Sequence, residues 1–196
     1  MPICPNRKFT VDPNACILLA LMVLVVPVRW ILAWLLAITV HELSHCIALR
    51  LCRVRIYSIN IGLFGAKIET EQMSAGVETL CAAAGPLGGT LLVFFLRQFP
   101  VVAICAAFQS AYNLLPILPL DGGRIIWCLL CLLKNERVSR LCRRIVEWGV
   151  FAILFFASLL ALHQHFGPIP LLCTISLFLK NRQIKFPCKR AEQIVQ

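Results

Sequence analysis

Six apolar segments, each about as long as a membrane-crossing helix or slightly shorter, dominate this sequence. They lie at residues 13–28, 30–50, 77–96, 101–120, 145–162 and 166–179. A helix needs about 20 apolar residues to cross the hydrocarbon core of a bilayer, which is about 30 Å thick. Hydrophobic residues make up 60% of the 196-residue chain and charged residues 14%, whereas a soluble domain carries about 25% charge. We therefore expect one membrane-embedded domain over residues 1–196, an all-α polytopic membrane protein with about six transmembrane helices, and neither a soluble enzyme nor a disordered chain.

The basic residues are concentrated between alternate apolar segments. The chain has 19 Lys and Arg against 9 Asp and Glu, a formal net charge of +10. With the six spans above, every basic residue except Arg29 and Arg97 falls on one side of the membrane. Short loops rich in Lys and Arg stay in the cytoplasm. We predict a multi-pass protein of the cell membrane with both termini in the cytoplasm, and the positive charge then requires no nucleic-acid partner.

The first apolar segment has a second interpretation. It follows Arg7 and Lys8, so residues 13–28 could belong to a signal peptide. No small-x-small cleavage site precedes Arg29, which favours a first helix that stays in the protein.

The 11 cysteines are scattered through the apolar segments and the stretches assigned to the cytoplasm. Thiols stay reduced in the cytoplasm, so a disulfide framework is not expected. Cys128 and Cys131 form a C-x-x-C pair, but no second pair follows at the spacing of a zinc site. We interpret these cysteines as small apolar side chains.

The second apolar segment contains an H-E-x-x-H motif formed by His41, Glu42 and His45. Residues four apart on a helix share a face, so both imidazoles can hold one zinc ion. Glu42 lies beside that face, where it can take a proton from a zinc-bound water. Three ionisable residues within one turn of a membrane helix are costly unless they are paired or bind an ion. We therefore favour a metal site over histidines that are merely hydrogen-bonded in a core. His163 and His165, two residues apart, suit no helix face and are interpreted as solvated loop residues.

Asp121 is the candidate for a third ligand, since a catalytic zinc needs three from the protein. It ends the fourth apolar segment, after Pro116 and Pro119, which break a helix. Non-helical backbone at membrane depth survives only when it packs in protein or lines a wet cavity. Glycines at 122–123 would permit a sharp backbone path that aims Asp121 at the zinc. The alternative is an ordinary helix C-terminus with a solvated Asp121.

The depth of these residues supports a common site. By helical rise, His45 lies about 7.5 Å and His41 about 13.5 Å from the cytoplasmic boundary at Arg50. Asp121 also lies at the cytoplasmic end of its segment. We therefore expect an active site that opens toward the cytoplasm.

The two motifs together resemble the site-2 protease family of intramembrane zinc metalloproteases. The H-E-x-x-H spans residues 41–45, and residues 113–123 read N-x-x-P-x-x-P-L-D-G-G. The compact form is most similar to the bacterial sporulation type. The resemblance covers about residues 30–125 and implies a three-helix catalytic core there, with the C-terminal helices over about 145–180.

The resemblance implies specific roles for five residues. His41, His45 and Asp121 would hold one zinc ion per chain, and Glu42 would be the general acid/base. Asn113 would orient the substrate or stabilise the oxyanion with its amide. The implied substrate is a membrane-spanning or membrane-tethered protein in the lipid bilayer. A homo-oligomer or a regulatory membrane partner is left open.

The third apolar segment departs from the family at one position. Its A-G-P-L at residues 84–87 resembles a family signature. The family usually continues to an Asn two residues later, where this chain has Gly89. We expect no polar contact of the kind that this Asn would make.

Residues 56–70 carry a strand pattern between the second and third apolar segments. Ile59, Ile61 and Leu63 alternate with other residues, and glycines stand where a hairpin could turn. We predict a small membrane-associated β-hairpin, with an amphipathic interfacial loop as the alternative. A free hairpin edge could accept an unwound substrate segment by strand addition, and the resemblance implies this use.

Two other functional classes fit part of the pattern. A membrane H-E-x-x-H peptidase of the prenyl-protein or HtpX-like type would take its third ligand from a downstream Glu, here Glu136 or Glu147. A non-catalytic membrane scaffold or a metal transporter belongs to a different class. A transporter is expected to carry acidic or His residues in several spans, whereas here they concentrate in two.

Overall fold

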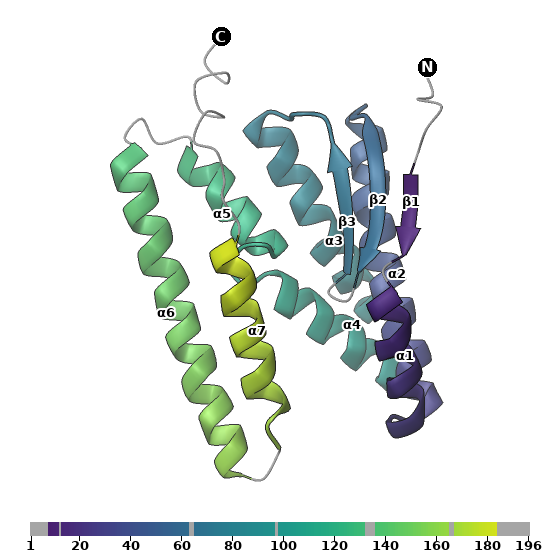
Figure 1. Cartoon of the computed structure of the whole chain (residues 1–196). Coiled ribbons are helices and arrows are strands. Elements are labelled where there is room, and N and C mark those ends of the chain that lie inside the picture. The colour runs from purple at the N-terminus through teal and green to yellow at the C-terminus, as the bar shows by residue number, and fades with distance from the viewer. Residues whose placement is uncertain are drawn as a thin grey trace. The chain divides into compact units, whose positions relative to one another are not determined.

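The computed structural model describes residues 8–11, 13–62, 65–96, 98–131, 136–164 and 167–183. In chain order the elements are β1 (Lys8–Val11), α1 (Pro13–Val25), α2 (Val28–Leu51), β2 (Ile56–Gly62), β3 (Gly65–Thr70), α3 (Ala75–Phe95), α4 (Pro100–Asn113), α5 (Asp121–Cys131), α6 (Glu136–His163) and α7 (Ile169–Gln183) (Figure 1). The predicted class, helices with a small β-hairpin, is confirmed. The chain divides into two compact units, which are described separately. The first holds Met1–Met73 and Ala83–Tyr112, and the second holds Ser74–Ala82 and Asn113–Gln196.

Among the described residues, three helices are long and apolar enough to cross a membrane: α2, α3 and the stretch Arg137–His163 of α6. Each of the six predicted spans contains a helix. The helices α1, α4 and α7 have 13, 14 and 15 residues, and at 1.5 Å per residue they are about 20–22 Å long. Six crossings therefore remain a prediction.

The fourth predicted span, residues 101–120, is wrong as a single helix. The helix α4 ends at Asn113, and an irregular segment leads from there to α5. The ring of Pro116 clashes with the turn before it and its nitrogen cannot donate a hydrogen bond, so the helix ends before it. The helix α5 and the first turns of α6 were not predicted at all.

Small side chains form the core of the first unit. Ala33 and Ala37 of α2 meet Cys105 and Ala106 of α4, and all four are buried. Small residues let apolar helices approach closely, so that packing can hold them together in lipid. Larger side chains surround this contact: Trp30, Trp34, Leu92, Val93, Val101 and Val102.

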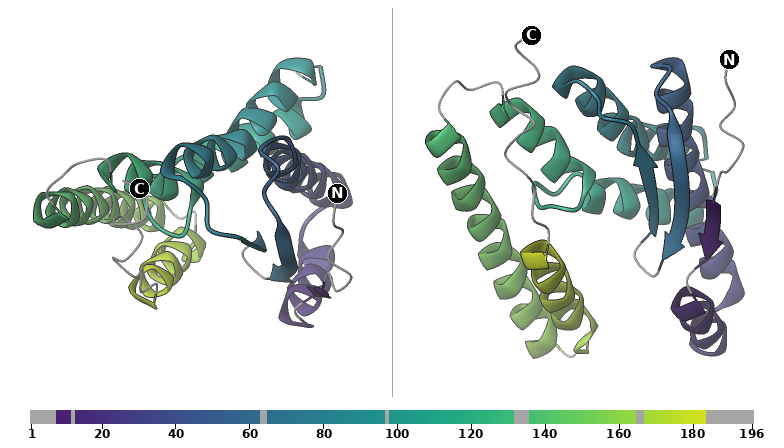
Figure 2. Two further views of the ribbon diagram at one scale, coloured as in Figure 1. Left: turned by 90° about the horizontal axis from the view of Figure 1, so that it is seen from above. Right: turned by 45° about the horizontal axis from the view of Figure 1, so that its top comes forward.

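A three-stranded sheet completes the first unit, and Figure 2 shows it beside α1 and α2. The strands β2 and β3 form the predicted antiparallel hairpin, with Ile59 opposite Ile68. Leu63, part of the predicted pattern, lies outside the described residues. The strand β1 was not predicted. It pairs in parallel with β2, Phe9 opposite Ile59, so the sheet order is β1-β2-β3.

The second unit is built on α6 and α7, which lie side by side (Figures 1 and 2). Its core joins Ile117, Phe151 and Leu177. Ile117 is fully buried and belongs to the segment between α4 and α5, so this irregular backbone is anchored in protein. That is the condition under which non-helical backbone is tolerated at membrane depth.

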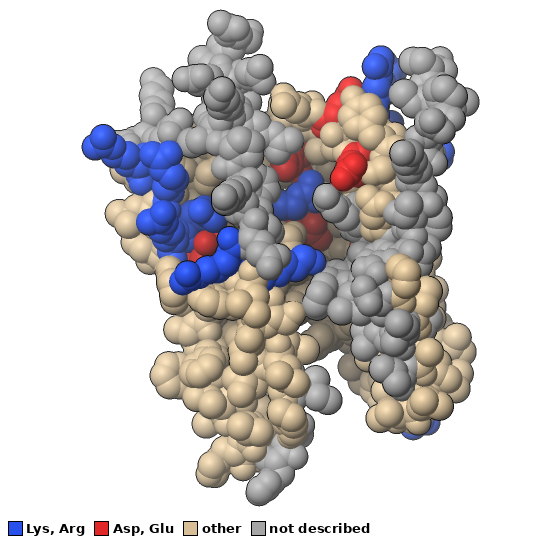
Figure 3. All heavy atoms as spheres, in the orientation of Figure 1, with Lys and Arg blue, Asp and Glu red and all other residues tan. Residues whose placement is uncertain are grey.

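The helix α6 has a basic surface over its first turns and an apolar surface along the rest of its length. Figure 3 shows Lys and Arg gathered over its first turns, where Arg137, Arg140 and Arg144 are exposed. Farther along the helix the exposed side chains are large and apolar, among them Ile153 and Phe156. A basic end followed by an apolar surface suits a helix that enters a bilayer from the headgroup layer.

The structure also places one of the two other histidines. His163 is exposed, as predicted, but it is the last residue of α6 and not a loop residue. His165 lies outside the described residues.

Candidate metal centre

The two histidines of the H-E-x-x-H motif lie together on α2, in the first unit. His41 is 2% and His45 8% exposed. Their Nε2 atoms are 3.2 Å apart, and the rings meet edge to face with centroids 4.8 Å apart. Two nitrogens each about 2.0–2.1 Å from a tetrahedral zinc lie about 3.3–3.4 Å from each other. The pair therefore fits two ligands of one zinc ion.

Gly85 of α3 packs directly on this pair. A Cβ at this position would overlap Nε2 and Cε1 of His45 and Cε1 of His41. The A-G-P-L sequence thus has a steric reason, because any side chain at its glycine would displace the imidazoles. The A-G-P-L sequence marked this position, but only the structure shows that its glycine contacts both imidazoles.

Two further glycines continue this close approach along α3. A Cβ at Gly88 would meet Ser44 of α2, and one at Gly89 would meet Ser110 of α4. The Ser110 hydroxyl is buried and has no hydrogen-bond partner within the described part of the chain. Gly89 therefore makes close packing possible here, and it supplies no polar side chain at the position where the resemblance predicts an Asn.

Glu42 follows His41 on α2 and is half-buried. It is one helical step, about 100°, from the face that carries the imidazoles. Its carboxylate therefore lies beside the face that carries the imidazoles, and its role as a proton acceptor stays a prediction.

Asp121 is the first residue of α5, in the second unit, and is 7% exposed. The alternative of a solvated residue at the end of a helix is therefore wrong. The helix that hydropathy extends to residue 120 stops at Asn113, itself half-buried. Because Asp121 and Asn113 lie in the second unit and the histidines in the first, the role of both residues at the pair is part of the proposal below.

Gly122 and Gly123 act differently from the prediction. Both lie in the first turn of α5, and neither has a positive φ. A Cβ at Gly122 would meet the carbonyl oxygens of Leu114 and Leu115, and one at Gly123 the backbone of Ile117. These glycines let the preceding segment pack against the helix start, so they fix the backbone at Asp121.

The C-x-x-C pair carries free thiols. Burial, with a smaller contribution from the Glu78 carboxylate, raises the pKa of Cys128 from 9.0 to about 12. A thiol with this pKa is neutral at physiological pH and is a poor nucleophile and metal ligand. This supports the interpretation of Cys128 as a small apolar side chain.

Known proteins share the fold of this chain and part of its sequence. No family model matches the chain. The structure is similar to the Site-2 Protease from Methanocaldococcus jannaschii, with a TM-score of 0.63, 17% sequence identity and 89% of each chain covered. The chain has the site-2 protease fold. The fold predicted from the two motifs is thereby confirmed, and the long apolar helices support a membrane protein.

The curated relatives are two proteins from strains of Mycobacterium tuberculosis, both named as zinc metalloprotease Rip3. Each is 30% identical over 115 residues, which covers 49% of this chain and 28% of the relative. The chain thus spans little more than a quarter of the length of the relatives that it matches.

Proposed function

We propose that this chain is an intramembrane zinc metalloendopeptidase that hydrolyses peptide bonds of membrane-spanning or membrane-tethered proteins. The observation that carries the proposal is the buried histidine pair of α2, with its Nε2 atoms 3.2 Å apart. The site-2 protease fold and the relatives named for zinc-dependent proteolysis support it. The pair occupies one of the helices suited to crossing a membrane, where such residues rarely lack a function.

The proposed ligands of a single zinc ion are His41, His45 and Asp121. All three are buried, and two imidazoles with one carboxylate are a donor set of hydrolytic zinc sites, which keep a fourth position open. When bound in such a site, zinc lowers the pKa of its water to about 7 and polarises the carbonyl under attack.

The protein's own groups then move the proton and bind the substrate. Glu42 accepts the proton of the attacking water and returns it to the leaving amine. The Asn113 amide donates a hydrogen bond to the carbonyl oxygen as negative charge develops there. A helical substrate must unwind first, because its carbonyls are held in i→i−4 hydrogen bonds.

The sheet of the first unit offers a place for the unwound segment. The strand β3 pairs with β2 on one side only within the described residues, so its outer edge can take an added strand. We place both termini and the opening of the site on the cytoplasmic side, by the distribution of Lys and Arg.

The test measures the zinc content of the purified, detergent-solubilised chain and, in cells, the cleavage of a co-expressed membrane substrate. The parent is expected to bind one zinc ion, and His41→Ala and Asp121→Ala are expected to lose it. Glu42→Gln is expected to keep the zinc but not to cleave the substrate. Cleavage by Glu42→Gln at the parent's rate would show that the catalytic assignment is wrong.

The rival third ligands are Glu136 and Glu147. The side chain of Glu136 lies outside the described residues. Glu147 accepts a hydrogen bond from Arg143 Nη1 at 2.9 Å, so an arginine already balances its charge. If Glu147→Ala lost the zinc and Asp121→Ala kept it, the rival class would be correct.

A further inference from the structure

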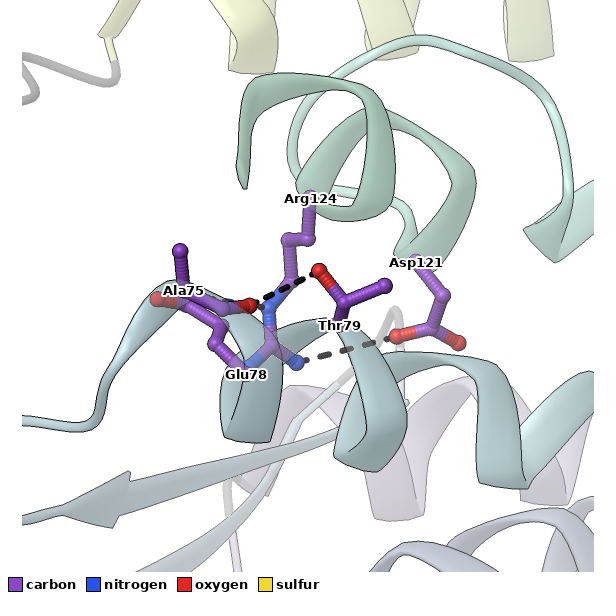
Figure 4. A network of polar contacts seen from close by, with 5 residues as sticks. All are labelled: Ala75, Glu78, Thr79, Asp121 and Arg124. Atoms are coloured by element: carbon purple, nitrogen blue, oxygen red, sulfur yellow. Dashed lines mark hydrogen bonds and ion pairs between the residues drawn. The ribbon is translucent and has the colours of Figure 1, made fainter. Parts of the chain in front are cut away.

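Three charged side chains of the second unit form a network around the proposed ligand Asp121 (Figure 4). Asp121 and Arg124 lie one turn apart on α5, with Arg124 Nη1 3.7 Å from Asp121 Oδ1. Arg124 Nε is 3.8 Å from Oε1 of Glu78, which lies in the first turn of α3. One guanidinium therefore faces two carboxylates that come from two helices.

The burial of these groups makes the network costly to disrupt. Glu78 is 6% exposed and Asp121 7%, and a buried carboxylate needs a compensating charge or hydrogen bonds. Both Arg124 distances exceed the roughly 2.7–2.9 Å of a charge-assisted hydrogen bond. Arg124 thus acts on both carboxylates mainly through Coulomb attraction, which is stronger in a partly buried setting than in water.

We propose that Arg124 is a positioning residue for the ligand Asp121 and that Glu78 anchors Arg124. This inference rests on the proposed function. Packing of Gly122 and Gly123 fixes the backbone at Asp121, but the carboxylate can still turn about its own two side-chain torsions. Attraction of Oδ1 to the guanidinium selects one orientation of the carboxylate.

The expected loss of zinc affinity can be estimated from other groups that orient a metal ligand. Groups that orient a metal-ligating side chain typically change metal affinity by about 10–100-fold. The planar guanidinium presents donors on separate edges, so it can face Asp121 and Glu78 together. A lysine ammonium is a single point charge and cannot span the two carboxylates in the same way.

A variant that lacks only Arg124 changes both the charge near the site and the orientation of Asp121, and these two changes have opposite effects on zinc affinity. Removing Arg124 alone deletes a positive charge near the site, which by itself favours binding of a divalent cation. The loss of orientation disfavours binding. Replacing both Glu78 and Arg124 by glutamine removes one charge of each sign, so this double variant isolates orientation.

The experiment measures zinc affinity of the full-length protein in detergent by competition with a chromogenic chelator. The Glu78→Gln/Arg124→Gln variant is expected to bind zinc about 10–100-fold more weakly than the parent. The matched control is Arg143→Gln/Glu147→Gln, which removes another ion pair of this unit. The control is expected to bind zinc as the parent does.

Two further measurements separate positioning from a general structural role. The melting temperature of the zinc-free double variant is expected to match that of the zinc-free parent. Arg124→Lys, which keeps the charge, is expected to lose less affinity than the double variant.

The failures of the two proposals can be told apart. If the parent binds zinc, Asp121→Ala does not, and the double variant binds as tightly as the parent, the positioning role is wrong and the proposed function stands. If the double variant unfolds without zinc, the zinc affinity of Arg124→Lys tests the inference instead. An affinity of Arg124→Lys equal to that of the parent would contradict the positioning role. If the parent binds no zinc, the proposed function itself fails.

Discussion

Adding one methyl group at Gly85 tests the close contact between α3 and the histidine pair. In Gly85→Ala the new Cβ would overlap Nε2 and Cε1 of His45 and Cε1 of His41. Either α3 moves away from α2 or the imidazoles turn, and both outcomes displace the nitrogens that would hold zinc.

The expected change in the free energy of unfolding combines two opposing effects of the substitution. Overpacking a well-packed contact costs about 1–3 kcal/mol, whereas Gly to Ala inside a helix stabilises by about 0.5–1 kcal/mol. Gly76 is the matched control, since it lies on the same helix with nothing within 4 Å of an added Cβ. Gly76→Ala should therefore stabilise the protein, and Gly85→Ala should be less stable than Gly76→Ala by about 1–3 kcal/mol.

The assay combines thermal unfolding of the two variants in detergent with zinc affinity from chelator competition. Gly85→Ala is expected to bind zinc about 10–100-fold more weakly than the parent, and Gly76→Ala to bind it equally well. If Gly85→Ala behaved like Gly76→Ala in both measurements, the account of the helix contact would be refuted.

Three other predictions follow from the site and its surroundings. Glu42→Gln should retain zinc while the cleavage rate falls by about 10²–10⁴-fold, the usual contribution of a general base; equal loss of zinc would show that Glu42 is a ligand instead. A zinc chelator should abolish cleavage by the parent and added zinc should restore it, whereas Asp121→Ala should stay inactive at the same zinc concentration; recovery of this variant would argue against Asp121 as a ligand. Since burial raises the pKa of Cys128 to about 12, its thiol should resist alkylation at pH 8 in the folded protein and react after denaturation, as read by mass spectrometry. The neutral thiol's contribution to stability should be complete below about pH 9, the unfolded value, and be lost as the pH rises toward 12; rapid alkylation of folded Cys128 would contradict this environment.

The proximity of the two histidines could be predicted from local geometry alone. Positions four apart on a helix share a face whatever the rest of the fold does, and the structure places His41 and His45 in that way. The hairpin could also be predicted, because the alternation and the glycines that specify it lie within 15 residues of one another. The strand β1 could not be predicted, since its four residues pair with β2 about 50 positions later and carry no signal of their own.

The start of α5 shows where hydropathy misleads. The segment between Asn113 and Asp121 is apolar, so it extends the fourth predicted span, although its prolines end the helix early. Glycine is a poor helix former, so residues 122–123 gave no reason to begin a helix at Asp121. Their role is to let backbone pack on backbone, which only the folded chain reveals. The partner role of Glu78 was missed for the same reason, because its pairing with Arg124 joins two helices.

The X-ray absorption spectrum of zinc in the purified protein tests the proposed metal site directly. We predict one zinc ion per chain with four nitrogen or oxygen neighbours at about 2.0–2.1 Å, two of them imidazole nitrogens. The chain has 11 cysteines, and a sulfur neighbour at about 2.3 Å, or a protein that retains no zinc, would contradict this prediction.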